Sequence, residues 1–316
     1  MADFQTQVLT PDAAGIGRAA ALLRAGQLVA FPTETVYGLG ADARNNSAVA
    51  RIFAAKNRPR SNPLIVHVAD LHAAREIADF DARATRLAEA FWPGPLTLLV
   101  ALKHNAGLSP DITAGLNTIA IRVPEHPLAR DLLREFAGPV AAPSANPSGR
   151  LSPTSAAHVL AGLGGRIAAV LDGGACEVGV ESTIIGLDPV PTLLRPGGLP
   201  AEIIEACLGQ PLSSLNAQPR PSAPGQLAVH YAPCAALRLN AASREQGEVL
   251  LGFGAAGCDL NLSASGDLVE AAANLFHHLR ALDDGNPGVI AVSPIPDHGL
   301  GRAINDRLRR AAAATP

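Results

Sequence analysis

Aromatic side chains are scarce in this sequence of 316 residues, of which Phe, Tyr and Trp make up 3%. The hydrophobic core must therefore be built mainly from Ala, Leu, Ile and Val, and base stacking on aromatic rings is disfavoured as a binding mode. No apolar run approaches the roughly 18–20 residues that a membrane span needs. The first residues, MADFQTQVLTPD, lack the basic region and the apolar stretch of a secretory signal peptide. We therefore expect a cytoplasmic protein.

The charge balance argues against a protein that binds nucleic acid or anionic lipid through its overall charge, and the cysteines argue against a cysteine-based metal site. The net charge is −3 at pH 7, which gives no whole-protein attraction to nucleic acid or to anionic lipid. Apolar residues make up 48% of the chain and charged residues 17%, which is the composition of a folded protein. Cys176, Cys207, Cys234 and Cys258 form no C-x-x-C or metal-binding pattern, so we expect reduced thiols.

Helical and extended patterns alternate along the first two thirds of the chain, as is typical of α/β proteins. Helices are expected at 10–25, 47–56, 71–79, 82–91, 127–137, 153–162 and 200–207. Strands are expected at 28–31, 64–69, 96–102, 118–123, 167–171, 182–187 and 192–195. Together they predict one large domain that covers residues 1–210.

A proline-rich segment at 211–233 has no clear period and is predicted to be a linker. After it, strands are expected at 248–253 and 288–292, and helices at 267–282 and 300–313. These elements predict a second, smaller α/β domain over 234–316. The string GFGAAG (252–257) fits the G-x-G-x-x-G pattern, but the residues CDLNLS that follow do not favour a helix. We therefore reject a dinucleotide site there.

One window of the sequence is strongly basic. No acidic residue occurs between positions 43 and 69, which include Lys56, one of only two lysines in the chain. Lys56 continues the apolar stripe of its predicted helix, and Arg58 and Asn62 follow in a proline-rich turn. Such a cluster of cations with an amide suits a polyphosphate. The alternative is a solvated basic turn whose cations are favoured by the helix dipole.

Two further strings place polar side chains at regular positions. In TIAIRV (118–123), alternation puts Thr118 and Arg122 on one strand face, as in a wall that binds an anion. The alternative is an ordinary solvent-facing strand. In APSANPSG (142–149), the prolines favour extended chain at Ser144 and Asn146, with both side chains on one side. The alternative there is an ordinary Asn-Pro turn.

Isolated polar residues also occur in other predicted strands and turns. The strand at 28–31 leads into the polar turn of FPTETVYGLG (31–40). His67 in LIVHVA and Ser182 in VESTIIG are lone polar residues in extended segments. A lone strand histidine is also typical of a half-buried structural residue, so this pattern by itself leaves its role open.

Taken together, these strings resemble one family, the threonylcarbamoyl-AMP synthases of the YrdC-like type with an added C-terminal domain. The matching strings are FPTETVYGLG, KNRPRSNPLIVH, FWPGPLT, TIAIRVP, APSANPSG, ESTII, LLRPG and HYAP, which occur in this order over residues 31–233. AANLFHHLRALD and GLGRAINDRLRRAA also look like the extra domain of the longer members. The resemblance implies a twisted mixed sheet flanked by helices, followed by a smaller Rossmann-like α/β domain.

The resemblance implies a nucleotidyltransferase that forms threonylcarbamoyl-AMP and pyrophosphate from L-threonine, bicarbonate and ATP. The product would feed threonylcarbamoyladenosine formation at tRNA position 37. Partner proteins would complete the transfer, so weak or no direct tRNA binding is expected. Mg²⁺ is the expected cofactor and would be held by the phosphates, since no cluster of His, Asp or Glu in the sequence identifies a metal site.

Matching the motifs position by position implies the site residues. The threonine pocket would be formed by Thr35, His67, Arg122, Ser144 and Ser182. ATP would be bound by Lys56, Arg58, Asn62, Thr118, Asn146, Thr154, Arg195 and Tyr231. Lys56, Arg58 and Arg195 would act in catalysis by neutralising phosphate charge. The linker would lie over the site as a gate, with Tyr231 touching the nucleotide, although residues 226–229 lack the basic residues common in the family.

Three alternatives remain at this stage. An RNA-binding protein without catalysis would use the basic window at 44–67. A carbamoyl-adenylate-forming enzyme, as in hydrogenase maturation, would carry acylphosphatase and zinc-finger segments that this sequence lacks. A regulatory protein with a degenerate pocket would not be expected to keep Lys56, Arg58, Ser144 and Asn146.

Overall fold

The computed structural model describes residues 5–214, 223, 230–254 and 257–313. Within them, the chain forms two sheets, a 12-stranded mixed sheet and a 4-stranded parallel sheet, each flanked by helices. The predicted fold class, a large mixed α/β sheet with a second smaller α/β unit, is confirmed. No described helix combines the length and the apolar character that crossing a bilayer requires.

The large sheet is built from short strands that are largely buried. In the order in which they pair they are β1 (Gln7–Leu9), β9 (Ala169–Leu171), β2 (Val29–Phe31), β3 (Gly38–Asp42), β8 (Val140–Ala141), β4 (Ile65–His67), β7 (Thr118–Arg122), β6 (Leu96–Leu102), β10 (Thr183–Gly186), β11 (Thr192–Arg195) and β12 (Ser213–Ser214). Strand β5 (Ala78–Asp79) pairs with β6 at one end. Because β4 and β7 are parallel neighbours in register, His67 lies directly beside Arg122.

Seven α-helices accompany this sheet in the described part of the chain. They are α1 (Ala13–Arg24), α2 (Asn46–Lys56), α3 (Leu71–Ile77), α4 (Ala82–Phe91), α5 (Pro127–Phe136), α6 (Ala156–Leu163) and α7 (Ala201–Leu208), and a 3₁₀ turn occupies Pro110–Ile112. Six of these helices begin after a side chain that accepts a hydrogen bond from a first-turn amide: Asp12, Asn45, Asp70, Asp81, His126 and Ser155. Such caps satisfy amides that have no partner within the helix.

Apolar side chains point to both faces of the large sheet, so helices cover both. Along β2, Ala30 belongs to one core cluster, whereas its neighbours Val29 and Phe31 belong to another. The second of these clusters contains α1 and α5, and the first contains α2, α3, α4 and α6. This arrangement follows from the alternation of side chains along a strand.

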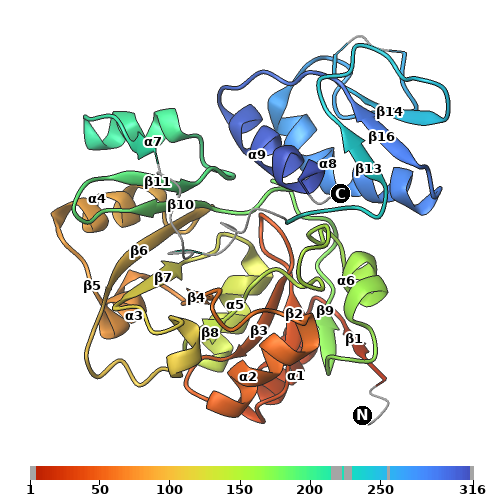
Figure 1. Cartoon of the computed structure of the whole chain (residues 1–316). Helices are drawn as coiled ribbons and strands as arrows, with labels where there is room; N and C mark the ends of the chain where they lie inside the picture. Colours follow the sequence, from red (N-terminus) through yellow and green to blue (C-terminus); the bar gives the residue numbers. More distant parts are fainter. Residues whose placement is uncertain (1–4, 215–222, 224–229, 255–256, 314–316) are drawn as a thin grey trace.

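The second sheet has the order β13 (Ala236–Arg238), β16 (Val289–Val292), β14 (Glu248–Gly252) and β15 (Leu260–Asn261). Helices α8 (Leu268–Asp284) and α9 (Leu300–Ala312) lie on the side that faces the first unit (Figure 1). Their core continues into the first unit, since Val36 and Val180 pack in the same cluster as Phe276 and Ile304. The two units therefore share apolar contacts beside the strand ends of the large sheet.

Several details differ from the sequence-based expectations. The helix expected from residue 153 begins at Ala156, because Ser155 caps it. The helix expected at 71–79 ends at Ile77, and the next two residues pair with β6. Strands β1, β3, β8 and β13 were not predicted. They are two to five residues long, and β3 (GLGAD) contains two glycines, which strands disfavour.

The segment predicted as a linker, 211–233, is described only in part. Residues 213–214 form β12 and pair with β11, whereas 215–222 and 224–229 lie outside the described residues, and with them the positions 226–229 discussed above. After GFGAAG the chain forms β15, and α8 begins only at Leu268. Among the described residues after this string, the first helix is therefore separated from its glycines by a strand.

Candidate functional site

A cavity with an empty volume of about 520 Å³ lies at the strand ends of the large sheet. This volume includes space that is open to solvent. The lining residues are Thr33, Thr35, Val36, Gly38, Arg58, Ile65, His67, Arg122, Ala142, Pro143, Ser144, Glu181, Ser182, Arg195, His230 and Tyr231. All five residues predicted for threonine are in this set, together with Arg58, Arg195 and Tyr231 from the ATP prediction.

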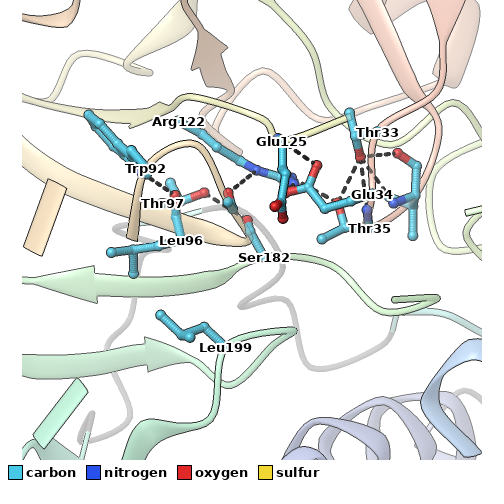
Figure 2. Close-up of polar contacts among 12 residues, drawn as sticks. Thr33, Glu34, Thr35, Trp92, Leu96, Thr97, Arg122, Glu125, Ser182 and Leu199 are labelled. Carbon is cyan, nitrogen blue, oxygen red and sulfur yellow. Dashed lines mark hydrogen bonds and ion pairs between the residues drawn. The ribbon is translucent and has the colours of Figure 1, made fainter. Parts of the chain in front are cut away.

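Arg122, the last residue of β7, is held rigidly in the cavity wall. Its Nε donates to the carbonyl oxygen of Gly94 over 3.2 Å and its Nη1 to Thr35 Oγ1 over 2.8 Å. Its Nη2 forms a buried ion pair with Glu34, which also accepts a hydrogen bond from the amide of Glu125 (Figure 2). These contacts use three of the five N–H donors of a guanidinium. The remaining two suit a carboxylate.

A second polar group comes from the segment before β10. Ser182 Oγ lies 2.7 Å from Thr97 Oγ1, as Figure 2 shows, and 3.1 Å from Nη2 of Arg195. Arg195 also donates from Nη2 to the carbonyl oxygen of Ser182 over 2.8 Å. Burial lowers the pKa of Arg195, and the nearby Arg307 acts in the same direction, whereas Tyr231 opposes it. Ser182 and Arg195 thus form one rigid unit across two adjacent strands.

Arg58 reaches the cavity from the turn after α2. The helix ends at Asn57, whose left-handed backbone (φ 51°) redirects the chain. Arg58 then donates from Nε to the carbonyl oxygen of Asn62 over 3.2 Å and from Nη2 to that of Pro63 over 2.7 Å. Burial lowers its pKa to about 10, and Arg195 contributes in the same direction. Arg58 therefore remains a cation at neutral pH.

The two histidines that line the cavity are neutral. Burial lowers the pKa of His67 to about 3, and the neighbouring Arg122 contributes to this. Burial likewise lowers the pKa of His230 to about 3. Nδ1 of each ring has no hydrogen-bond partner among the described residues. These nitrogens can therefore accept a hydrogen bond from a ligand or donate one to it, according to the tautomer.

Lys56 does not line the cavity, although it lies next to it. Its side chain is 1% exposed, and its ammonium donates to the carbonyl oxygens of Ser144 and Asn146. The backbone between these two residues is a tight turn in which the Asn146 amide donates to the Ser144 carbonyl oxygen over 3.0 Å. The expectation of extended chain holds at Ser144, which forms an antiparallel bridge with Gly38, but the chain bends at Asn146. Lys56 closes the turn by binding both carbonyls, a long-range contact that local sequence does not encode.

Of the remaining ATP predictions, two carry buried polar atoms without partners. Asn62 is fully buried, and neither its Oδ1 nor its Nδ2 has a partner within the described parts of the chain; the same holds for Oδ1 of Asn146. Unpaired buried polar groups are costly and often mark a ligand site. Thr118 lies at the opposite end of β7 from Arg122, and Thr154 hydrogen-bonds with His158. Neither threonine lines the cavity.

Sequence reasoning missed three residues at this site. Glu34, the partner of Arg122, occurs in the quoted string FPTETVYGLG, but no local signal pairs it with an arginine 88 residues away. Glu181 and His230 line the cavity and immediately precede the predicted residues Ser182 and Tyr231. Among the residues that the structure describes, no group of three or more His, Cys, Asp or Glu side chains could hold a metal ion.

Two family models match the chain. The Sua5/YciO/YrdC model, described as "Telomere recombination", matches residues 21–197. A second model, described as "Threonylcarbamoyl-AMP synthase, C-terminal domain", matches residues 199–313.

The chain belongs to the Sua5/YciO/YrdC family.

Relatives in this family match almost the whole chain. The threonylcarbamoyl-AMP synthase of Bacillus subtilis is 44% identical over 97% of this chain and 95% of its own length. That of Pyrococcus abyssi is 42% identical over 93% of each. A crystal structure of P. abyssi Sua5 complexed with L-threonine has 39% identity and a TM-score of 0.91, and the match covers 97% of this chain and 98% of that one.

These likenesses confirm the resemblance that the motifs predicted, including the added C-terminal unit. They also favour the synthase over an RNA-binding protein or a carbamoyl-adenylate-forming enzyme, because the relatives that match the chain from end to end carry the synthase name. The roles of the individual residues stay predictions, which the geometry above makes specific.

Proposed function

We propose that this chain is an L-threonylcarbamoyladenylate synthase, a nucleotidyltransferase that forms threonylcarbamoyl-AMP and pyrophosphate from L-threonine, bicarbonate and ATP. The observation that carries the proposal is the composition of the cavity. Residues predicted for an amino acid and cations predicted for phosphates line the same space, although they are scattered between positions 35 and 231. Relatives that match the chain over nearly its full length support the same reaction.

The amino acid would be held at the β4–β7 side of the cavity. The two N–H donors of Arg122 that its protein partners leave over would bind the carboxylate of threonine. The hydroxyl groups of Ser144 and Ser182 would bind the polar groups of the amino acid. Because His67 is neutral, it adds no charge that would compete with Arg122 for the carboxylate.

The nucleotide would occupy the side formed by Arg58 and Arg195. Both guanidinium groups are buried and anchored to backbone carbonyls, so they are oriented before a phosphate arrives. The unpaired amide atoms of Asn62 and Asn146 would bind the nucleotide nearby. Lys56 would act indirectly, by holding the turn that carries Ser144 and Asn146. This assignment revises its predicted role as a phosphate-neutralising cation.

The chemistry requires no protein nucleophile. The threonine amine combines with bicarbonate, with loss of water, to form a carbamate. A carbamate oxygen then attacks the α-phosphorus of ATP, and pyrophosphate leaves. The chain contributes proximity and fixed positive charge, of which Arg58 and Arg195 supply the part nearest to the phosphates. Mg²⁺ belongs to the proposal as a companion of ATP that neutralises phosphate charge, since phosphate oxygens are among its usual ligands.

The product would pass to partner proteins that transfer the threonylcarbamoyl group to tRNA at position 37. The chain itself would bind tRNA weakly or not at all, because its net charge is −3. Such a reaction belongs in the cytoplasm, where tRNA and ATP are found.

The proposal is tested by measuring pyrophosphate release with ATP, threonine and bicarbonate, and with each omitted in turn. We expect release only when all three are present, and loss of release in Arg122→Ala. Arg134→Ala is the matched control, because Arg134 is an exposed arginine paired only with Asp131 among the described residues. Release without threonine, or release supported by carbamoyl phosphate in its place, would contradict the proposal. Salt-sensitive RNA binding without ATP turnover would favour the RNA-binding alternative.

A further inference from the structure

The most deeply buried arginine near the cavity comes from the C-terminal unit. Arg307 lies on α9 and is 1% exposed. Its Nε donates to Oε2 of Glu181 over 2.6 Å, and its Nη2 donates to the carbonyl oxygen of Pro196 over 3.0 Å. Its Cζ lies 4.8 Å from the centroid of the Tyr231 ring. One guanidinium thus contacts three separate segments of the first unit and the linker.

Each of these three segments belongs to the cavity. Glu181 and Tyr231 line it, and Pro196 follows Arg195, which also does. Tyr231 has a left-handed backbone (φ 64°), a conformation that non-glycine residues adopt only when their surroundings enforce it. Its ring contacts both Arg307 and Phe276 of α8. The C-terminal unit therefore fixes the wall from outside.

The ion pair between Arg307 and Glu181 affects the charge that a nucleotide would meet in the cavity. Glu181 is 5% exposed and accepts hydrogen bonds only from Ser152 and Arg307 in the described part of the chain. Its carboxylate also interacts electrostatically with Arg195. Without Arg307, the carboxylate would keep only the hydrogen bond from Ser152 and its interaction with Arg195, and it would compete with the triphosphate for that arginine. Asp306, the other acidic partner of Arg307, would keep its ion pair with Arg310, so the loss would fall on Glu181.

We propose that Arg307 is a positioning residue of the synthase: it neutralises Glu181 and holds Tyr231, so that α9 of the C-terminal unit completes the nucleotide side of the cavity. The proposal rests on the function proposed above. It gives the C-terminal unit a defined task in ATP binding. The carboxylate of Glu181 without its Arg307 partner would repel a triphosphate strongly. It would affect threonine far less, because threonine is a zwitterion without net charge.

The test compares Arg307→Gln, Arg307→Lys and the double variant Glu181→Gln/Arg307→Gln in the full chain. Arg309→Gln is the control, since Arg309 is an exposed arginine on the same helix. KM for ATP and for threonine are measured by pyrophosphate release, ATP affinity by calorimetry, and folding by thermal melting. We expect Arg307→Gln to raise KM for ATP by about tenfold or more and to change KM for threonine by less than about threefold. Removing the charge of Glu181 should restore most of the loss, and Arg307→Lys should be intermediate.

The proposal would be overturned if Arg307→Gln and Arg309→Gln had the same KM for ATP. A folded double variant whose KM for ATP is no lower than that of Arg307→Gln would also overturn it, because the defect would then be structural. If Arg307→Gln does not fold, the double variant decides: KM for ATP within about threefold of the unaltered chain supports charge neutralisation, and a larger rise overturns it. An unaltered chain that binds ATP but releases no pyrophosphate contradicts the proposed function, whereas calorimetry still tests Arg307.

Discussion

Replacing Lys56 by methionine would test whether this lysine acts on the turn or on the phosphates. The substitution keeps an unbranched side chain of similar length and removes the ammonium donors. In the structure these donors bind the carbonyl oxygens of Ser144 and Asn146 inside the protein. The variant therefore leaves the two carbonyls without the donor that closes the turn.

The expected loss of stability in Lys56→Met follows from the hydrogen-bond partners that the two carbonyls keep. The Ser144 carbonyl keeps the hydrogen bond from the Asn146 amide, whereas the Asn146 carbonyl has no other partner among the described residues. An unsatisfied buried carbonyl costs about 1–3 kcal/mol, and a weakened one costs about 1 kcal/mol. We therefore expect the free energy of unfolding to fall by about 2–4 kcal/mol. Because the turn carries Ser144 and Asn146, turnover should also fall by about 30-fold or more, equivalent to about 2 kcal/mol.

Urea unfolding gives the stability change, and pyrophosphate release gives turnover and both KM values. Lys103→Met is the matched control, because it alters the only other lysine in the chain, which does not line the cavity. We expect the control to change stability by less than about 0.5 kcal/mol. If Lys56→Met kept normal stability and raised KM for ATP alone, Lys56 would contact phosphate directly and the reasoning from the turn would be refuted.

Two further predictions concern the threonine side of the cavity. Glu34→Ala leaves Arg122 as an uncompensated buried cation and should lower the free energy of unfolding by about 3–5 kcal/mol. Glu34→Gln should lower it less, because the amide oxygen can still accept a hydrogen bond from Arg122. Equal losses for the two variants in urea unfolding would contradict this. His67 has a folded-state pKa of about 3, so the unfolded chain binds a proton that the folded chain does not as pH falls below about 6.5. The free energy of unfolding should therefore decrease as the pH is lowered from about 6.5 to about 3. In urea unfolding at pH 5–7, His67→Gln should reduce the dependence of this free energy on pH by up to about 1.4 kcal/mol per pH unit. An unchanged pH dependence would argue against a neutral buried His67.

The sequence by itself determined most of the longer elements and part of the inventory of the site. The alternation in β7 and the apolar stripe of α2 are local signals, because each acts between residues a few positions apart. The strings around them identified the family. They also identified the five residues predicted for threonine, which the structure brings into one cavity.

Only the tertiary structure decided which side chain partners which. Arg122 pairs with Glu34 across 88 positions of sequence, Lys56 reaches a turn 88–90 positions away, and Arg307 pairs with Glu181 across 126. Such contacts arise when elements distant in the chain pack together and bury their charges, which then need an opposite charge or a hydrogen bond within a few ångströms. Local pattern determines where a side chain can point, whereas the packing of the whole chain determines what it meets there.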